Sequence, residues 1–379
     1  MRFVIFTHSL VSDWNHGNAH FLRGIATELV RRGNSVHILE PVDGWSRENL
    51  LAEHGERAIA AFEKAYPLIR SETYREADLD LAEVLRNSDV VIVHEWNSHS
   101  LVRRIGEHHK EHWDYRLFFH DTHHRSVTEP ASMAAYDLRY YDGVLAYGNV
   151  IRDIYQANGW TSRAWTWHEA ADTNVFRPVE LPDDAQMEGD LVWIGNWGDN
   201  ERGEELREFL IEPVRKLRLK ARIYGVRYPD DALDALDEAG IEYGGWLPNY
   251  LVPQVFSRYR VTVHVPRRPY AEALPGIPTI RPFEAMACAI PLISATWRDT
   301  EKLFRAETDF IFANTGAEML RHIARVLEDS GISHALAAGG LETIRARHTC
   351  AHRVDELMQI ISVLQESSTK LTKIAGGNL

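Results

Sequence analysis

The sequence contains only two cysteines, Cys288 and Cys350, among its 379 residues. So few cysteines provide neither a disulfide framework nor a cysteine-based metal site, and this scarcity is typical of proteins in a reducing compartment. The chain also lacks a run of about 20 apolar residues, the length that a bilayer-spanning helix needs. Thr7 and His8 follow the first six residues, so the apolar stretch at the start is too short for the core of a signal peptide. We therefore expect a cytoplasmic protein without a transmembrane segment.

Positive charge is also in short supply. Lys and Arg number 42 against 55 Asp and Glu, which gives a formal net charge of −13. This excess of negative charge argues against a general nucleic-acid or anionic-membrane surface, so we expect no nucleic-acid partner. The hydrophobic content of 45% is enough to bury substantial cores, and the length predicts about two domains.

The first half of the chain has the pattern of a parallel α/β sheet, because apolar runs of strand length alternate with helical periodicity. The pattern predicts strands at 2–6, 35–39, 89–94, 115–120 and 141–147, and helices at 17–32, 47–65, 79–86 and around Leu101 and Ile105. The strand at 141–147 is expected to be the last of this sheet. We place the first domain at residues 1–175.

Polar loops follow the carboxyl ends of these strands, which is where open α/β sheets bind ligands. The loop after the first strand contains His16 and Gly17, and Gly17 is the expected place for a close approach of the backbone to a ligand. The motif G-x-G-x-x-G is absent, so the sequence lacks a dinucleotide-binding fingerprint. A second polar cluster, His120-Asp-Thr-His-His-Arg125, follows the strand at 115–120.

Several of the 19 histidines lie between His94 and His124, and this cluster has two interpretations. One is a metal site, although the residue order matches neither H-x-H-x-D-H nor H-E-x-x-H. Its possible ligands are His108, His112, His120, Asp121, His123 and His124. The other interpretation is a loop in which Asp and His side chains form hydrogen bonds to the backbone.

A polar and acidic tract at residues 181–190 predicts the boundary to a second domain. Beyond it the pattern predicts strands at 191–195, 221–225, 260–265, 291–294 and 309–312, and helices at 204–217 and 230–239 and from residues 317, 334 and 350 onward. We place the second domain at residues 188–350. The last segment, 351–379, is discussed with the resemblance below.

The stretch at residues 274–294 carries the clearest functional signal. A loop leads to Thr279, a possible N-cap, and to a short helix with Arg281 and Glu284 in its first turn. Free N–H groups and the helix dipole favour a phosphate at such a helix start, and Arg281 can add a bidentate clamp. Glu284 can accept hydrogen bonds from paired hydroxyls such as those of a ribose. A helix with an ordinary charged first turn is the simpler alternative.

The segment Arg281-Pro-Phe-Glu-Ala-Met-Ala-Cys288, followed by Pro-Leu-Ile-Ser, resembles the donor-binding segment of GT-B glycosyltransferases (glycosyl transferases group 1). It is most similar to the branch related to spore-maturation CgeB proteins. In that family the glutamate matching Glu284 binds the nucleotide ribose. Many retaining members carry another glutamate eight positions earlier, where this chain has Gly276. The resemblance implies a retaining, metal-independent reaction, and Gly276 leaves the stereochemistry open.

Other segments resemble motifs of the same family. The segment from His168 to Pro178 is similar to its inter-domain signature, with Glu169-Ala170 in place of Asn-Gly. The segment from Gly244 to Asn249 is similar to the loop that lies against the nucleobase. A histidine at the end of an N-domain strand often contacts the donor sugar, and His120 matches that position. The family's final helix crosses back onto the first domain, as we expect of residues 351–379.

The resemblance also implies the residues of the site. The family binds the donor diphosphate with an arginine and a Lys-Gly pair, which Asn196 and Arg202-Gly203 replace here. The candidate binding residues are Gly17, Gly195, Asn196, Arg202, Trp246, Leu247, Arg267, Arg281 and Glu284, and the candidate catalytic residues are His16, His120 and Asp121.

Together these features predict an α/β protein with two facing Rossmann-like domains of the GT-B type and a donor cleft between them. The expected reaction moves a sugar from a nucleotide-activated donor to an unidentified carbohydrate, lipid or protein acceptor. We expect no cofactor beyond the donor substrate and no bound metal. The alternatives are a nucleotide-sugar epimerase on the same fold and a metal-dependent hydrolase that uses the His94–His124 cluster.

Overall fold

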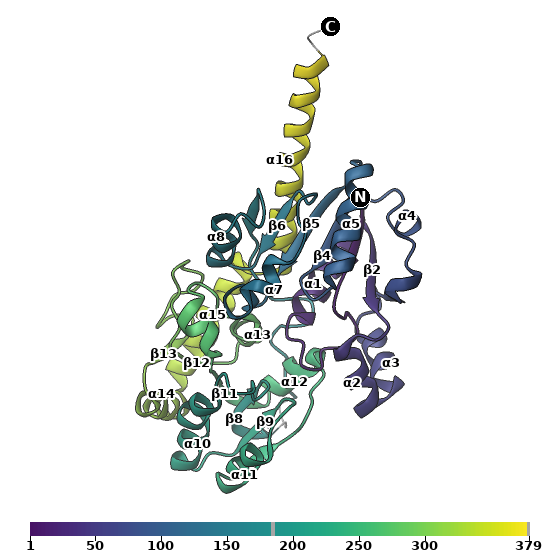
Figure 1. Ribbon diagram of the computed structural model, residues 1–379. Coiled ribbons are helices and arrows are strands. Elements are labelled where there is room, and N and C mark those ends of the chain that lie inside the picture. Colours follow the sequence, from purple (N-terminus) through teal and green to yellow (C-terminus); the bar gives the residue numbers. More distant parts are fainter. Residues whose placement is uncertain (183–185, 377–379) are drawn as a thin grey trace.

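The protein consists of two parallel α/β sheets with helices packed around each of them (Figure 1). The structure is a computed structural model that describes residues 1–182 and 186–376, with side chains described as far as residue 366. In the described part of the chain, the first sheet has the strand order β3-β2-β1-β4-β5-β6-β7 and the second the order β10-β9-β8-β11-β12-β13. The predicted pair of Rossmann-like domains is confirmed.

The N-terminal domain alternates strands and helices along the chain. Its elements are β1 (Arg2–Phe6), α1 (Ala19–Arg31), β2 (Ser35–Pro41), α2 (Trp45–His54), α3 (Glu56–Ala65), β3 (Ser71–Tyr74), α4 (Leu81–Val84), β4 (Val90–His94), α5 (His99–Glu111), β5 (Arg116–Asp121), α6 (Arg125–Thr128), α7 (Pro130–Ala134), β6 (Gly143–Ala146), α8 (Asn149–Ala157) and β7 (Ala164–Thr166). The central strand β4 is buried along its whole length, as expected for a parallel sheet covered on both faces.

The two edge strands of this sheet were not predicted. β3 has the sequence Ser-Glu-Thr-Tyr and is largely exposed, so it lacks the apolar run by which the inner strands are recognised. β7 has three residues, and its presence makes the prediction of β6 as the last strand wrong. The single helix predicted at 47–65 is two helices, α2 and α3, because Gly55 between them has φ 66°.

The C-terminal domain repeats the same alternation. Its elements are β8 (Gly189–Ile194), α9 (Gly203–Leu206), a π-helical turn (Arg207–Ile211), α10 (Glu212–Leu217), β9 (Ala221–Tyr224), α11 (Asp230–Glu238), β10 (Ile241–Tyr243), α12 (Val252–Phe256), β11 (Tyr259–His264), a second π-helical turn (Pro269–Ala273), α13 (Ile280–Ala287), β12 (Leu292–Ala295), β13 (Ile311–Ala313), α14 (Gly316–Glu328), α15 (Ser330–Arg347) and α16 (Cys350–Gly376). The edge strand β10 was not predicted. Residues 183–185 of the predicted linker lie outside the described residues.

The last helix, α16, begins beside the second domain and packs on α1 of the first domain (Figure 1). The two helices come so close that a side-chain carbon at Gly24 of α1 would lie 2.4 Å from the Cys350 sulfur. The indole N–H of Trp167 donates to the carbonyl of Arg353, 2.8 Å away. Next to it, the backbone of Ala171 pairs with the end of α15, donating to the His348 carbonyl at 2.9 Å. The chain thus ties its two domains together on the side of α16.

None of the helices in the described part of the chain combines the length and the apolar character that crossing a bilayer requires.

The apolar face of α16 should contribute strongly to the stability of the N-terminal domain. Leu357 is fully buried in the core cluster that contains α1, whereas Val363 on the same helix is 53% exposed. We expect Leu357→Ala to lower the free energy of unfolding by about 2 to 5 kcal/mol, because it leaves a cavity. Val363→Ala is the matched control and should change it by about 0.5 kcal/mol or less. Equal shifts of the two variants in denaturant unfolding would contradict the packing of α16 described above.

Candidate functional site

A cleft of about 560 Å³ lies between the domains, at the carboxyl ends of both sheets. The loops after β1 and β5 line it from the first domain, and the loops after β8 and β11 and the start of α13 line it from the second. This is where ligands bind to open parallel sheets, and the volume is typical of small-molecule sites. The cleft contains nine of the predicted site residues: His16, Gly17, Gly195, Asn196, Arg202, Trp246, Leu247, Arg267 and Arg281.

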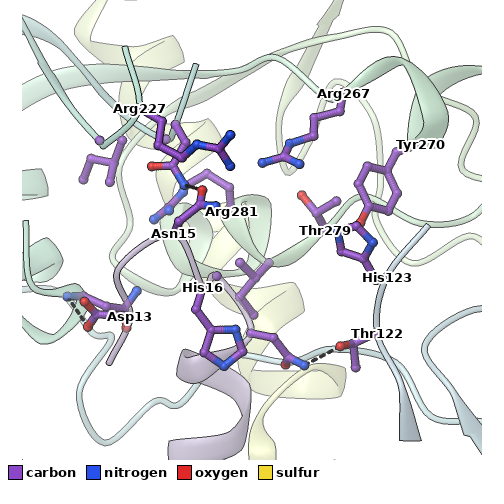
Figure 2. A pocket seen from close by; sticks show the side chains of 18 of the residues that line it. Asp13, Asn15, His16, Thr122, His123, Arg227, Arg267, Tyr270, Thr279 and Arg281 are labelled. Carbon is purple, nitrogen blue, oxygen red and sulfur yellow. Dashed lines mark hydrogen bonds between the residues drawn. The ribbon is translucent and has the colours of Figure 1, made fainter. Parts of the chain in front are cut away.

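The wall contributed by the second domain is rich in arginine. Arg227 and Arg267 extend toward each other over the cleft, with Arg281 nearby and His16 and Thr122 on the other side (Figure 2). Arg227 is paired with Asp199 at 2.8 Å, and Arg267 with Glu201 at 3.2 Å.

Arg202 lies deeper in this wall. Its guanidinium group donates to the carbonyl of Val265 at 2.9 Å and lies 5.0 Å from the centroid of the Trp193 ring. Burial, together with the positive charge of Arg267 and Arg281, lowers the pKa of Arg202 to about 9. The cleft therefore holds cations that repel each other, and an anion bound between them would remove that repulsion.

The start of α13 faces the same cations. Thr279, the predicted N-cap, has φ 64° and its side chain makes no hydrogen bond to the helix, so the predicted cap is wrong. Thr279 lines the cleft instead. A non-glycine residue at positive φ is strained, and such strain is often found at ligand sites. The first N–H groups of α13 are thus left without a capping side chain, beside Arg281.

Glu284 does not line the cleft, and its side chain is fully buried. Asn249 donates to Glu284 Oε1 at 2.7 Å, His20 Nδ1 lies 3.0 Å from the same oxygen, and Arg281 pairs with Oε2. The backbone N–H of Asp172 donates to His20 Nε2, which places the ring proton on Nδ1, facing Glu284.

These contacts set the charge of Glu284. Burial raises the pKa of Glu284, but the charge of Arg281 and the hydrogen bonds from His20 and Asn249 outweigh it, so the pKa lies below its ordinary value. The carboxylate stays ionised at neutral pH. The prediction of Glu284 in the first turn is wrong, because α13 starts at Ile280 and Glu284 lies beyond its first turn. Its side chain faces His20 of the first domain.

A second carboxylate, Asp13, joins the domains at the other end of the cleft. Its two oxygens accept hydrogen bonds from the Trp246 indole at 2.9 Å and from the Asn249 backbone at 3.0 Å. Arg23, which is fully buried, donates to the same carboxylate at 2.7 Å. One face of the Trp246 ring lies near His54, with ring centroids 4.3 Å apart. Trp246 therefore lines the cleft in a fixed orientation.

Asn196 and Gly17 also lie where the domains meet. The Asn196 side-chain amide donates to the Asn15 side chain, and its oxygen accepts a hydrogen bond from the Val226 backbone at 2.9 Å. A side-chain carbon at Gly17 would come within 3.6 Å of Ile280, the first residue of α13. Both positions thus allow the two halves of the cleft to approach closely.

Known proteins resemble this arrangement. Residues 204–359 match the family described as glycosyl transferase-like. The whole chain is similar to sucrose-phosphate synthase from Thermosynechococcus elongatus, with TM-score 0.64, 13% sequence identity and coverage of 97% of this chain and 100% of that one. It is also similar to Anabaena HepE in complex with UDP, with TM-score 0.66, 13% identity and coverage of 96% and 100%.

A third similar structure is an alpha-glucosyltransferase in complex with UDP and a 13-mer DNA, with TM-score 0.66, 11% identity and coverage of 96% and 99%. A comparison with curated proteins found no sequence that matches this chain. The whole chain thus has the two-domain GT-B fold, and residues 204–359 within it match a glycosyl transferase-like domain. The predicted fold class is confirmed.

In this GT-B protein, His120 and Asp121 do not lie where the sequence placed them. His120 is buried below the sheet edge, with Nδ1 3.0 Å from His94 Nε2 and its ring near Phe21 and Trp167. Neither residue lines the cleft. The residues after them, Thr122, His123 and His124, do line it, because β5 extends one residue farther than predicted and ends at Asp121.

Asp121 is fully buried. Burial and the nearby Glu95 raise the pKa of Asp121 to about 8, and its Oδ1 accepts a hydrogen bond from the His123 backbone at 3.1 Å. This contact stabilises the turn that carries Thr122 and His123 into the cleft. In the present arrangement Asp121 therefore supports the loop without contacting the cleft.

Gly276, the departure from the family's retaining pattern, has a structural reason. Its φ of 93° favours glycine, and a side-chain carbon there would lie 2.6 Å from a carboxylate oxygen of Glu301. Glu301 accepts hydrogen bonds from the Asn149 backbone at 2.7 Å and from His168 Nε2 at 2.8 Å. The space beside Gly276 is thus filled by a carboxylate that joins the two domains.

Two cleft residues that were not among the candidate site residues are Glu169 and Thr122. Thr122 donates to Glu95 at 3.0 Å and accepts a hydrogen bond from Asn18 at 2.5 Å, so it links the loops after β1, β4 and β5. Glu169 lies in the inter-domain segment where it replaces the asparagine of the family motif. That substitution was the signal in the sequence that could have identified it.

The histidine cluster does not form a metal site in the structure. Among the residues described, no group of three or more His, Cys, Asp or Glu side chains is arranged to hold a metal ion. His108 and His112 lie on α5 and just after it, with ring centroids 4.4 Å apart. Neither of these two histidines lines the cleft.

The buried cluster around Glu284 should be essential for stability. Glu284→Ala leaves Arg281 and His20 without their acceptor, and removing one partner of a buried ion pair costs about 3 to 5 kcal/mol. The control is Glu242→Ala, because Glu242 pairs with Arg222 at the surface with 59% of its side chain exposed, and such pairs contribute about 1 kcal/mol or less. Denaturant unfolding measures both. A Glu284→Ala protein as stable as the control would show that the cluster does not hold the domains together.

Proposed function

We propose that this protein transfers a sugar from a nucleoside diphosphate donor to an acceptor, and that the donor binds in the inter-domain cleft. The observation that carries the proposal is the group of Arg202, Arg267 and Arg281 around the start of α13. A diphosphate presents several anionic oxygens, and guanidinium groups and free helix N–H groups bind such oxygens well. As the sugar leaves, negative charge develops on the diphosphate, and the same groups stabilise it.

The second domain also offers a place for the nucleoside. Trp246 and Leu247 line the end of the cleft near Asp13. Tyr224 and Gly225 also line the cleft, and the Gly225 backbone donates to the Gly245 carbonyl, next to Trp246, at 2.8 Å. We assign the base to this end because the rings offer a face for stacking and because the indole is held in place by Asp13. Glu284 would act on the nucleotide through Arg281 in this arrangement, since its own carboxylate is covered. We also propose that this chain belongs to the CgeB-related branch of the family.

We take UDP as the first nucleotide to test. Anabaena HepE, a protein similar to this chain, has been solved with UDP and with UDP-glucose. At 11 to 14% identity these proteins share the fold with this chain, and the choice of nucleotide remains part of the proposal.

The acceptor is assigned to the loops of the first domain. Trp96 follows β4, lines the cleft and is 42% exposed, with the Arg125 guanidinium 4.7 Å from the centroid of its ring. His16 and His123 line the same side and are candidates for accepting the acceptor's proton. Burial lowers the pKa of both histidines, so each ring is neutral at pH 7 and has a free lone pair, although the same shift weakens it as a base. One similar structure contains DNA, but the net charge of −13 disfavours a nucleic-acid acceptor here.

We propose a reaction without a metal, in which the arginines carry out the stabilisation of the leaving group. Retention or inversion is left open by Gly276. Nothing in the cleft or the comparisons supports the epimerase or the hydrolase alternative. Incubating the protein with UDP-glucose and following the release of UDP, with and without added chelator, tests the proposed chemistry, because water can take the glucosyl group in place of the acceptor. UDP release that depends on protein and survives the chelator is the expected result.

Arg281 should bind the diphosphate and not the nucleoside. We expect Arg281→Ala to weaken UDP binding by about 10- to 100-fold, because a hydrogen bond to a charged group contributes about 1.5 to 3 kcal/mol. Its effect on uridine should be much smaller. Arg215→Ala is the control, since Arg215 is an exposed residue of α10 paired with Glu212. Calorimetry measures the affinity of each variant for UDP and for uridine. Equal losses of affinity for the two ligands would show that Arg281 acts through the fold alone.

A further inference from the structure

Glu169 is a buried carboxyl group that faces the cleft and has no protein partner in the described structure. The residue is 6% exposed and lines the cleft. Among the hydrogen bonds and ion pairs of the described residues, none involves its side chain, in contrast to Glu284, Glu301 and Asp13 around the same cleft. Because this carboxyl group faces the cleft and receives no hydrogen bond from the described residues, its hydrogen-bond partner must be water or a molecule bound in the cleft.

The backbone holds Glu169 firmly. It lies in the segment that joins the domains, where the neighbouring His168 binds Glu301 at 2.8 Å and its carbonyl accepts a hydrogen bond from Arg353 at 2.9 Å. Two residues farther on, Ala171 pairs with the start of α16. Glu169 is thus fixed at the junction of the two domains, close enough to Arg281 of the second domain to feel its charge.

We propose that Glu169 donates a hydrogen bond from its protonated carboxyl group to a hydroxyl of the sugar that is transferred. This inference rests on the proposed function and names a contact to the part of the donor beyond the diphosphate. The sugar must lie between the arginines that bind the diphosphate and the first-domain loops that bind the acceptor. Glu169 occupies that junction.

The surroundings of Glu169 determine that it acts as a donor. The charged and titratable groups that face it are Glu95 after β4, Tyr147 after β6, Tyr270 after β11, and Arg281 and Glu284 of α13. Burial first, and then the charges of Glu284 and Glu95, raise the pKa of Glu169 to about 8, while Arg281 opposes the shift. A bound diphosphate adds more negative charge and raises the pKa further. A neutral carboxyl group has one O–H to donate, which suits a sugar hydroxyl.

Binding of UDP and UDP-glucose by variants of the full-length protein tests this contact. Glu169→Ala should bind UDP as the wild type does and UDP-glucose about tenfold more weakly, because one hydrogen bond in a desolvated site is lost. Glu169→Gln keeps a neutral donor of the same length and should recover most of that loss. Equal losses for UDP and UDP-glucose in the alanine variant, or a glutamine variant as weak as alanine, would overturn the proposal.

The outcomes separate this inference from the proposed function. If the wild type binds both ligands and the alanine variant loses affinity for neither, the Glu169 contact is wrong and the uridine donor stands. If the wild type binds neither ligand, the proposed uridine donor fails, and the sugar contact built on it fails as well.

The pH dependence of stability gives a second test that needs no ligand. Below about pH 4.5 the Glu169 carboxyl group is protonated in both the folded and the unfolded chain. Between about pH 4.5 and 8 it ionises only in the unfolded chain, so the wild type loses stability as the pH rises through this range. The glutamine variant does not ionise. We expect the Tm of Glu169→Gln, relative to the wild type, to increase from pH 5 to pH 8 and to level off above pH 8. A constant difference would show that Glu169 is ionised in the folded protein and would overturn its role as a donor. Glu242→Gln, at an exposed ion pair, is the matched control.

Discussion

The rest of the site depends on the buried ionic contact between Glu284 and its partners from both domains. A carboxylate taken out of water must be surrounded by donors, and here they come from Arg281 and Asn249 of the second domain and His20 of the first. The pairing holds α13 against α1, so that Arg281 and Thr279 face the cleft. The buried charge of Glu284 thus links the second domain to the first through His20.

The cleft itself has the opposite balance of charge. On its second-domain wall, Arg202, Arg267 and Arg281 lie close enough to lower the pKa of Arg202, and the acidic partners nearby, such as Glu201, do not offset this. The chain as a whole is strongly acidic, with a net charge of −13. This cleft thus gathers positive charge within an acidic chain, which suits the binding of a small anionic ligand.

Buried carboxyl groups around the cleft differ in role because they differ in partners. Glu284 has a cation and two donors and stays ionised, whereas Glu169 has neighbouring carboxylates and no donor and is neutral near pH 7. Asp13 and Glu301 each join the two domains through hydrogen bonds to backbone or side-chain N–H groups. Residue type alone does not distinguish these four cases.

The sequence by itself determined the alternation of strands and helices and nine of the twelve candidate site residues, since apolar periodicity and the loops after strands are local features. The resemblance of its motifs to a known family predicted the two-domain GT-B fold. The sequence did not predict edge strands such as β3, which lack that periodicity. It also wrongly placed the side chains of His120 and Glu284 in the cleft. Whether those two side chains reach the cleft depends on one residue of strand length and on the rotation of one helix turn. Only the tertiary structure decided this, because burial and hydrogen-bond partners arise where segments distant in the chain meet, as His20 meets Glu284.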